Sequence, residues 1–205
     1  IMEHLKLGVL CSHNGTNLQA IIDACVNGQL KAELRIVIGN NSKSYALIRA
    51  ERSNIPVSHI SGKTHESLDS IDEAILETLL DNQVNLVLLA GYMKKLGPKT
   101  LSEYNGRILN IHPSLLPLYG GKNMFGRAVH QAVLNANDTV TGASIHLVNQ
   151  EYDVGKVLAQ IKIPVHKNDT VDSLSDRVLK HEHKLYVKTL QMIERGDIKL
   201  RGLTI

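Results

Sequence analysis

The chain has 205 residues, of which 43% are hydrophobic and 21% charged, the composition of an ordinary globular domain. A domain of this length buries about 70% of its unfolded surface, so it needs neither a disulfide nor a metal to fold. The net charge of +3, the absence of Trp and the single Phe argue against a nucleic-acid-binding face, which clusters basic and aromatic residues. The mild positive charge instead favours small anionic ligands.

Cysteine usage and apolar runs indicate the compartment. Cys11 and Cys25 fit neither a metal-ligand spacing nor a secreted disulfide framework. The apolar run Leu7–Cys11 is too short for a signal peptide or a membrane span. We therefore expect a cytoplasmic protein that acts on small molecules, away from nucleic acid and membranes, as a monomer or a homodimer.

Short β-rich runs alternate with helical patterns along the chain, which predicts βαβ units and a mainly parallel sheet. In chain order we expect a strand at 7–11, a helix from Leu18, a strand at 34–39, a helix at 45–53, a strand at 57–60, a helix at 70–80, strands at 84–90 and 108–111, a helix at 127–134, strands at 141–148 and 157–163, and a helix at 171–195. The prediction is one α/β domain over residues 1–205, doubly wound, with helices on both faces of the sheet.

The segment LNIHPSLLP at residues 109–117 carries the most chemical information. In a strand, Asn110 and His112 share a face, and Pro113 ends the strand because proline cannot donate to a ladder. Polar side chains at the carboxyl end of a parallel strand are placed where open α/β sheets bind ligands. From spacing alone, a structural hydrogen-bonded pair and a functional pair are equally good interpretations.

The polar turn between the first strand and the first helix, Ser12–Asn17, is a candidate phosphate site. Such a turn presents free backbone N–H groups at a positive helix end, although Asn17 could equally serve only as a helix cap. A dinucleotide-binding turn would need Gly-x-Gly-x-x-Gly and an acidic residue after the second strand. Here the turn has one glycine and the second strand ends Ile38-Gly39-Asn40-Asn41, so hydride transfer is disfavoured.

The stretch LNIHPSLLP resembles the signature of the folate-dependent formyltransferases. Three more segments resemble the glycinamide ribonucleotide branch of that family, in the same order: SHNGTNLQAIIDAC, LAGYMKKL and EYDVGKVLAQ. The resemblance runs from about Leu7 to Arg195. It implies transfer of a formyl group from 10-formyltetrahydrofolate to the amine of a phosphoribosylated glycinamide in purine synthesis, without a metal.

The resemblance also implies roles for individual residues. The catalytic group would be Asn110, His112 and Asp153. His112 and the amide of Asn110 suit the stabilisation of a developing oxyanion, and His112 also suits proton transfer. Asp153 would orient and charge the imidazole.

Substrate and folate sites follow from the same resemblance. The substrate phosphate would lie on Gly15, Thr16 and Asn17, and Glu182 would contact the glycinamide portion, its alternative being a solvated helix residue. The pterin ring would be held largely through backbone groups of two segments, and the residues implied in folate binding are Met93, Lys94, Lys95, Leu96, Asn110, Asn149, Gln150, Glu151, Tyr152 and Asp153. The run His181-Glu182-His183 is rejected as a metal site, because HExxH requires a histidine where Leu185 stands.

Three features depart from the family pattern or extend it. His13 stands where the family's Gly-Asn-Gly-Ser-Asn turn has glycine. Leu68 stands where relatives carry an arginine thought to meet the folate tail, a role open here to Lys63, Lys94 or Lys95. The segment Leu118–Arg127, with three glycines and the apolar Met124 and Phe125, predicts a mobile flap over the site, with an ordinary surface loop as the alternative.

Three rival functions are weighed. A methionyl-tRNA formyltransferase is expected to carry a further C-terminal domain of about 100 residues, and a formyltetrahydrofolate deformylase an N-terminal regulatory domain. The first predicted strand starts within ten residues of the first residue given, and the sequence given ends at Ile205, so we expect neither. A non-catalytic phosphate-binding module would explain the turn at residues 15–17 but not the three catalytic-type residues.

Overall fold

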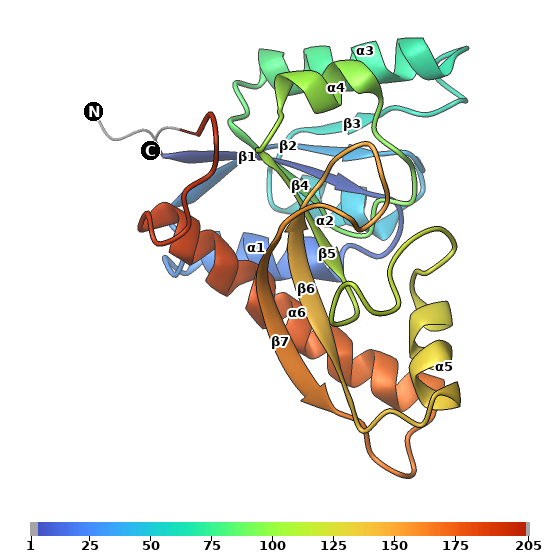
Figure 1. Cartoon of the computed structure of the whole chain (residues 1–205). Coiled ribbons are helices and arrows are strands. Elements are labelled where there is room, and N and C mark those ends of the chain that lie inside the picture. The colour runs from blue at the N-terminus through green and yellow to red at the C-terminus, as the bar shows by residue number, and fades with distance from the viewer. Residues whose placement is uncertain (1–3, 204–205) are drawn as a thin grey trace.

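The computed structural model describes residues 4–203, which form one seven-stranded sheet in the order β3-β2-β1-β4-β5-β6-β7 (Figure 1). The strands from β3 to β5 are parallel, while β6 runs antiparallel to both β5 and β7. The predicted mainly parallel α/β sheet is therefore confirmed. The strands are β1 (Leu5–Cys11), β2 (Ala32–Gly39), β3 (Val57–His59), β4 (Leu86–Leu89), β5 (Ile108–His112), β6 (Val140–Leu147) and β7 (Val157–Pro164).

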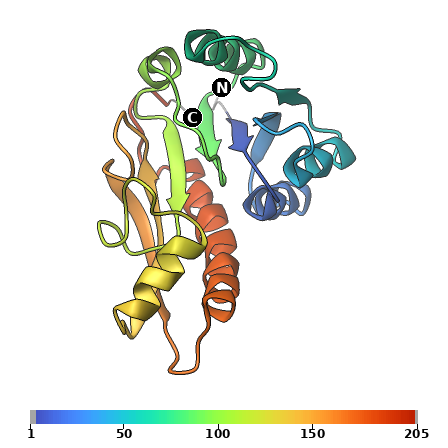
Figure 2. The ribbon, with the colours of Figure 1, turned by 90° about the vertical axis from the view of Figure 1, so that its right-hand side faces the viewer.

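Helices cover both faces of this sheet, also as predicted (Figures 1 and 2). The side chains of α3 and α4 pack on one face, and those of α1, α2 and α6 on the other. Helix α5 lies against α6 beside the β6–β7 end of the sheet. The helices are α1 (Thr16–Val26), α2 (Tyr45–Arg52), α3 (Leu68–Asp81), α4 (Pro98–Glu103), α5 (Arg127–Asn135) and α6 (Val171–Glu194).

The strands divide their apolar residues between two cores. On β5, Leu109 and Ile111 join the core under α1 and α6, whereas Ile108 joins the core under α3 and α4. Successive side chains of a strand point to opposite faces, so continuous apolar runs are stable only where both faces are covered. Asn110 and His112 therefore share the face opposite Leu109 and Ile111.

Helix α4 is an element that the sequence does not predict. Pro98 stands in its first turn, and the carboxylate of the buried Asp72 accepts hydrogen bonds from the amides of Lys99 (2.7 Å) and Thr100 (3.1 Å). The cap thus comes from α3, far away in the chain. A side chain at Gly97 would collide with Asp72, since an added Cβ would lie 2.2 Å from its Cγ.

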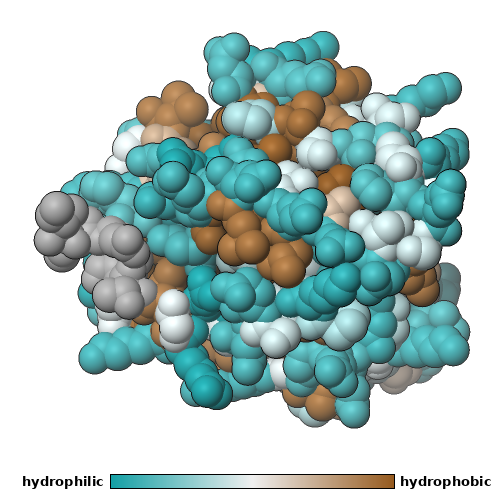
Figure 3. Space-filling model, turned by 90° about the horizontal axis from the view of Figure 1, so that it is seen from above, coloured by the Kyte–Doolittle hydropathy of each residue, from teal (hydrophilic) through white to brown (hydrophobic). Residues whose placement is uncertain are grey.

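The surface over α3 and α4 is largely hydrophilic, with separate hydrophobic spots (Figure 3). Within residues 4–203, the helices include none that combines the length and the apolar character needed to cross a membrane. The carboxyl ends of β1, β4 and β5 meet at one edge of the sheet, beside the first turn of α1. This arrangement positions the site described next.

Candidate active site

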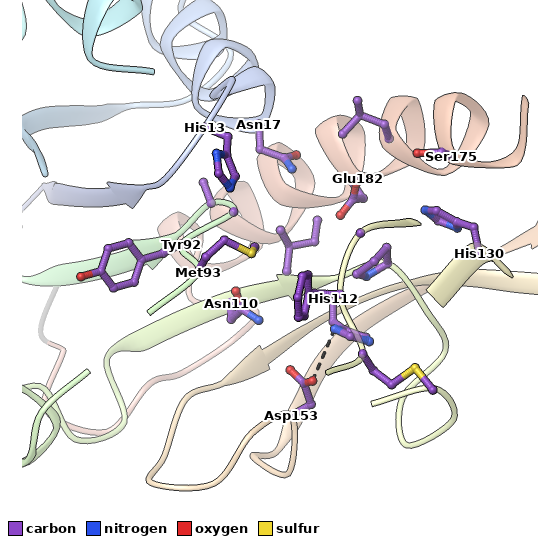
Figure 4. A pocket seen from close by; sticks show the side chains of 18 of the residues that line it. His13, Asn17, Tyr92, Met93, Asn110, His112, His130, Asp153, Ser175 and Glu182 are labelled. Atoms are coloured by element: carbon purple, nitrogen blue, oxygen red, sulfur yellow. Dashed lines mark ion pairs between the residues drawn. The ribbon is translucent and has the colours of Figure 1, made fainter. Parts of the chain in front are cut away.

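A cavity of about 730 Å³ opens at the carboxyl ends of β1, β4 and β5 (Figure 4). The first turn of α1, the segment 121–126, and side chains of α5 and α6 complete its walls. The residues that the sequence assigns to the site and the structure places in this cavity are Gly15, Thr16, Asn17, Met93, Asn110, His112, Tyr152, Asp153 and Glu182.

A chain of contacts joins the three predicted catalytic residues through a fourth, His146. The side-chain nitrogen of Asn110 lies 3.1 Å from Nε2 of His146, and this nitrogen lies 3.4 Å from Oδ1 of Asp153. The second carboxylate oxygen of Asp153 lies 3.5 Å from Nδ1 of His112. Asn110 and His146 face each other across the β5–β6 ladder, so the antiparallel pairing itself brings them together.

Burial and charge set the protonation of this group. Burial lowers the pKa of His112 below its usual 6.5, against the raising effect of the Asp153 charge. Burial alone would raise the pKa of Asp153, but the neighbouring His146 and His112 lower it overall. Near neutral pH the site therefore holds a neutral imidazole beside a carboxylate.

The glycine-rich segment Leu118–Arg127, which we call the flap, is tied to both members of this pair. Nε2 of His112 donates to the carbonyl oxygen of Tyr119 at 2.7 Å, and the amide of Gly121 donates to Asp153 at 2.9 Å. The donation fixes the proton of the neutral ring on Nε2. Nδ1 then presents a lone pair to the carboxylate of Asp153. The 3.5 Å between Nδ1 and Oδ2 of Asp153 agrees with this, because it is too long for a strong hydrogen bond.

The turn before α1, residues 13–17, is the segment predicted to bind phosphate, and we name it the phosphate turn for that prediction. Its Gly15 is the N-cap of α1 and has a φ of 71°, with no side-chain cap bond. An added Cβ there would lie 2.7 Å from Cα of Ala46, so both conformation and space require glycine. The first N–H groups of a helix have no intrahelical acceptor, and the residues that begin this helix, 15–17, line the cavity.

Asn17 lies inside α1 and does not cap it, so the interpretation of this residue as a helix cap is wrong. Its side chain is 8% exposed, and its Oδ1 finds no hydrogen-bond partner in the part of the chain that the structure describes. Figure 4 shows the side chain at the cavity wall. A buried amide oxygen without a partner costs about 1–3 kcal/mol, and a hydroxyl or N–H group of a bound ligand would recover that free energy by donating to it.

Glu182 projects from α6 into the cavity (Figure 4). It is 7% exposed, and burial raises its pKa from 4.5 to about 8. The alternative of a solvated helix residue is therefore wrong. Leu179 and Ser175 lie on the same face of α6, one and two turns nearer its start respectively, and also line the cavity.

His130 of α5 is a cavity residue that the sequence does not single out. It is 3% exposed, and its Nδ1 is without a partner among residues 4–203. Burial lowers its pKa to about 4, and the charges of His112 and Arg127 act in the same direction. Its sequence neighbours Val129 and Val133 are core residues, so the local pattern resembles that of a structural histidine.

The residues expected to hold the pterin divide into two groups. Met93 and Tyr152 line the cavity, and Nζ of Lys95 lies 5.1 Å from the ring centre of Tyr152, joining the two segments. Leu96 is buried in the core under α3 and α4. The expected residues outside the cavity lining are Lys94, Lys95, Leu96, Asn149, Gln150 and Glu151. Leu68, where an arginine was expected, is 86% exposed at the start of α3.

Metal-ligating side chains do not gather anywhere in the described region, where no group of three or more His, Cys, Asp or Glu residues is placed to hold an ion. The cavity itself presents four kinds of polar group. These are an imidazole paired with a carboxylate, an amide donor, a helix N-terminus and a buried carboxyl group. They suit transfer of an acyl group to a phosphorylated acceptor.

Comparison with known proteins agrees with this site. Residues 5–190 match the model of the formyl transferase family, and the chain belongs to that family. It is 38% identical over 196 residues to the phosphoribosylglycinamide formyltransferase of Haemophilus influenzae, covering 96% of this chain and 90% of that one. It is also 38% identical to the trifunctional purine biosynthetic protein adenosine-3 of Bos taurus, covering 95% of this chain and 19% of that protein.

A solved structure is similar over nearly the whole chain. Glycinamide ribonucleotide transformylase 1 from Symbiobacterium toebii superposes with a TM-score of 0.89 at 35% identity, covering 97% of this chain and 92% of that one. The fold and the family named by the sequence motifs are therefore both confirmed, and the chain is a one-carbon transferase.

Proposed function

We propose that the chain transfers a formyl group from 10-formyltetrahydrofolate to the amine of N1-(5-phosphoribosyl)glycinamide in de novo purine biosynthesis. The observation that carries the proposal is the position of two sites in one cavity. The paired His112 and Asp153 lie on its floor, and the phosphate turn lies at its wall. A phosphorylated acceptor bound at the turn has its reactive end held near the imidazole.

The acceptor would be held by groups that lack protein partners. Its phosphate would accept from the first N–H groups of α1, with the amide of Asn17 beside them. Glu182 projects between the phosphate turn and His112 in Figure 4. A carboxyl group with its pKa raised to about 8 is mostly protonated near neutral pH, and it can both donate to and accept from the middle of the substrate.

The donor would lie against the segments 91–97 and 149–153, where Met93 and Tyr152 line the cavity. The family implies a folate-type formyl donor. Met93 is held in place because its amide donates to Oγ of Ser12 at 2.7 Å. The two segments bring apolar and aromatic surface to the mouth of the cavity, which suits a flat heterocycle.

The acceptor amine attacks the formyl carbon, a carbon–nitrogen bond forms, and negative charge develops on the formyl oxygen. Nε2–H of His112 donates to Tyr119 in this structure, and the formyl oxygen takes the place of that carbonyl oxygen. The N–H of Asn110 that His146 does not use is a second donor. Each well-placed donor of this kind stabilises an oxyanion by about 3–4 kcal/mol.

A proton then leaves the amine and reaches the folate nitrogen as the bond between that nitrogen and the formyl carbon breaks. His112 carries this proton at Nε2: once the Tyr119 carbonyl is displaced, the proton of the neutral ring moves to Nδ1 beside Asp153, and the freed Nε2 takes the amine proton and passes it to the folate nitrogen. When the ring is charged, Nδ1–H faces the carboxylate of Asp153, and the 3.5 Å contact becomes an ion pair. Asp153 thus stabilises the imidazolium form without taking the proton.

The experiment that tests the proposal uses 10-formyltetrahydrofolate labelled in the formyl carbon, with a matched substrate lacking the phosphate. Label should appear on the glycinamide amine of the phosphorylated substrate, and far more slowly on the dephosphorylated one. Label released only as formate, at a rate that the amine does not change, would contradict the proposal and indicate a deformylase.

A further inference from the structure

Helix α2 contributes one charged side chain to the phosphate turn from outside the cavity. We propose that Arg49 is a positioning residue that holds the phosphate turn in its binding conformation and adds positive charge behind it. The inference rests on the proposed function, because it assigns the turn to the phosphate of the acceptor. It concerns a residue that does not line the cavity.

Arg49 connects the turn to the helix that follows it. Its Nε donates to the carbonyl oxygen of Asn14 at 2.8 Å, and one terminal nitrogen donates to Oε1 of Gln19 at 3.1 Å. Asn14 immediately precedes Gly15, the N-cap of α1, and Gln19 lies in the first turns of α1. The planar guanidinium therefore fixes the carbonyl of the turn relative to the axis of α1, as a fork of donors in fixed geometry can do.

The rest of α2 supports the same turn. The amide of Ala46 donates to the carbonyl oxygen of His13 at 3.1 Å, and Gly15 packs directly on Cα of Ala46. Three successive residues, 13 to 15, are thus held by α2. The contacts of Ala46 involve its backbone and its Cβ and are rigid, whereas the Arg49 contact is made by a long side chain and can be removed by substitution.

An aromatic ring holds Arg49 in place. Its guanidinium carbon lies 4.7 Å from the ring centre of Tyr45, a cation–π distance. Arg52 stacks on the same ring at 5.7 Å and donates to its hydroxyl at 3.0 Å, but it makes no contact with the turn among the hydrogen bonds of residues 4–203. Arg52 is therefore a matched control of the same type on the same ring.

The charge of Arg49 is available to a ligand. No carboxylate in the described chain forms an ion pair with it. The charge also reaches α6: burial lowers the pKa of His183, and the charge of Arg49 lowers it further. An unneutralised cation next to the N-terminus of α1 raises the local potential for a dianionic phosphate.

The test compares Arg49→Gln with Arg52→Gln in steady-state kinetics and in calorimetric titration with ribose 5-phosphate. Arg49→Gln should raise KM for the phosphoribosyl substrate by about tenfold and weaken the binding of ribose 5-phosphate by a similar factor. Its kcat should stay within about twofold, and KM for the folate should not change. Arg52→Gln should match the wild type in every measurement. Arg49→Lys keeps the charge but loses the planar set of guanidinium donors, so its KM for the phosphoribosyl substrate should lie between those of the wild type and Arg49→Gln.

Equal KM values for the phosphoribosyl substrate in Arg49→Gln and Arg52→Gln would overturn the inference. So would a KM of wild-type size in Arg49→Lys, because position would then not depend on the fork. A lowered melting temperature together with weaker binding of both substrates would show a structural role only and would also overturn it. If the wild type bound ribose 5-phosphate but transferred no formyl group, the proposed function would be wrong. The affinities of Arg49→Gln and Arg52→Gln for ribose 5-phosphate would then still test the role of Arg49.

Discussion

The Nε2 atom of His112 lies 2.7 Å from the carbonyl oxygen of Tyr119, so the flap itself occupies the donor that the reaction needs. The other ring nitrogen faces Asp153, and no nitrogen of the ring is left for a substrate. Tyr119 is held in turn by its hydroxyl, which donates to Asp138 at 2.6 Å. In the proposed reaction, the Tyr119 carbonyl must therefore leave Nε2 before the formyl oxygen can reach it.

Limited proteolysis should detect this movement. Lys122 lies at an exposed position of the flap, and cleavage there should be fast in the free protein and at least about tenfold slower with both substrates bound, because a flap closed over the ligands opens less often. Tyr119→Phe removes the bond to Asp138 and should speed cleavage in the free protein. A cleavage rate that ligands leave unchanged would make this segment an ordinary surface loop.

Substitution of the catalytic group should lower turnover strongly. His112→Ala, Asn110→Ala and Asp153→Asn should each reduce kcat by at least about a hundredfold, the size expected for loss of one oxyanion donor or proton carrier. Since the three act through one chain of contacts, the double variants should lose less than the product of the single losses. Near-normal turnover in a folded His112→Ala protein would contradict the assignment.

Phosphate recognition should separate from folate binding at Asn17. Asn17→Leu removes a side-chain amide from the cavity wall, including the N–H group that can donate to a phosphate, and should weaken binding of the phosphoribosyl substrate by about tenfold, while folate affinity stays the same. Each ligand is titrated alone, so the two affinities are independent. Equal weakening of both would point to misfolding or to a phosphate site elsewhere.

The buried carboxyl group of Glu182 should make stability depend on pH. Its pKa is raised from 4.5 in the unfolded chain to about 8 in the fold, so the unfolded state loses its proton first as pH rises. The stability of the wild type should therefore fall between pH 5 and pH 8 relative to Glu182→Gln. At pH 8.5 the variant should melt at least about 3 °C higher, the shift that about 1 kcal/mol produces at this chain length.

Melting curves of both proteins at pH 5.5 and pH 8.5 measure that difference. A gap between wild type and Glu182→Gln that stays the same at both pH values would show that the carboxyl group has an ordinary pKa. Glu182 would then not serve as a protonated donor to the substrate.

Much of the fold follows from local pattern, since apolar runs and helical spacing predict each strand and most helices. Helix α4 does not, because its cap is Asp72, a residue of another helix. The start of α1 at Thr16, two residues before the predicted Leu18, has a similar cause. The turn is set by contact of Gly15 with Ala46, and such contacts leave no mark in the local sequence.

The site follows from sequence only in part. Strand alternation places Asn110 and His112 on one face, but it does not predict their contacts with His146 and Asp153. His146 reaches Asn110 because β6 pairs antiparallel with β5. Asp153 lies in a turn, with a φ of 56°, that local pattern does not predict. His130 sits between core valines and looks structural in sequence. Its role in the cavity depends on how α5 docks against α6, which no local pattern records.

The most direct measurement mixes the protein with 10-formyltetrahydrofolate and N1-(5-phosphoribosyl)glycinamide and follows folate absorbance, with His112→Ala as the control. Tetrahydrofolate should be released only when the amine substrate is present, at a rate that rises with its concentration and falls at least about a hundredfold in the control. Release that does not depend on the amine substrate, or no release from the folded wild type, would contradict formyl transfer to that acceptor.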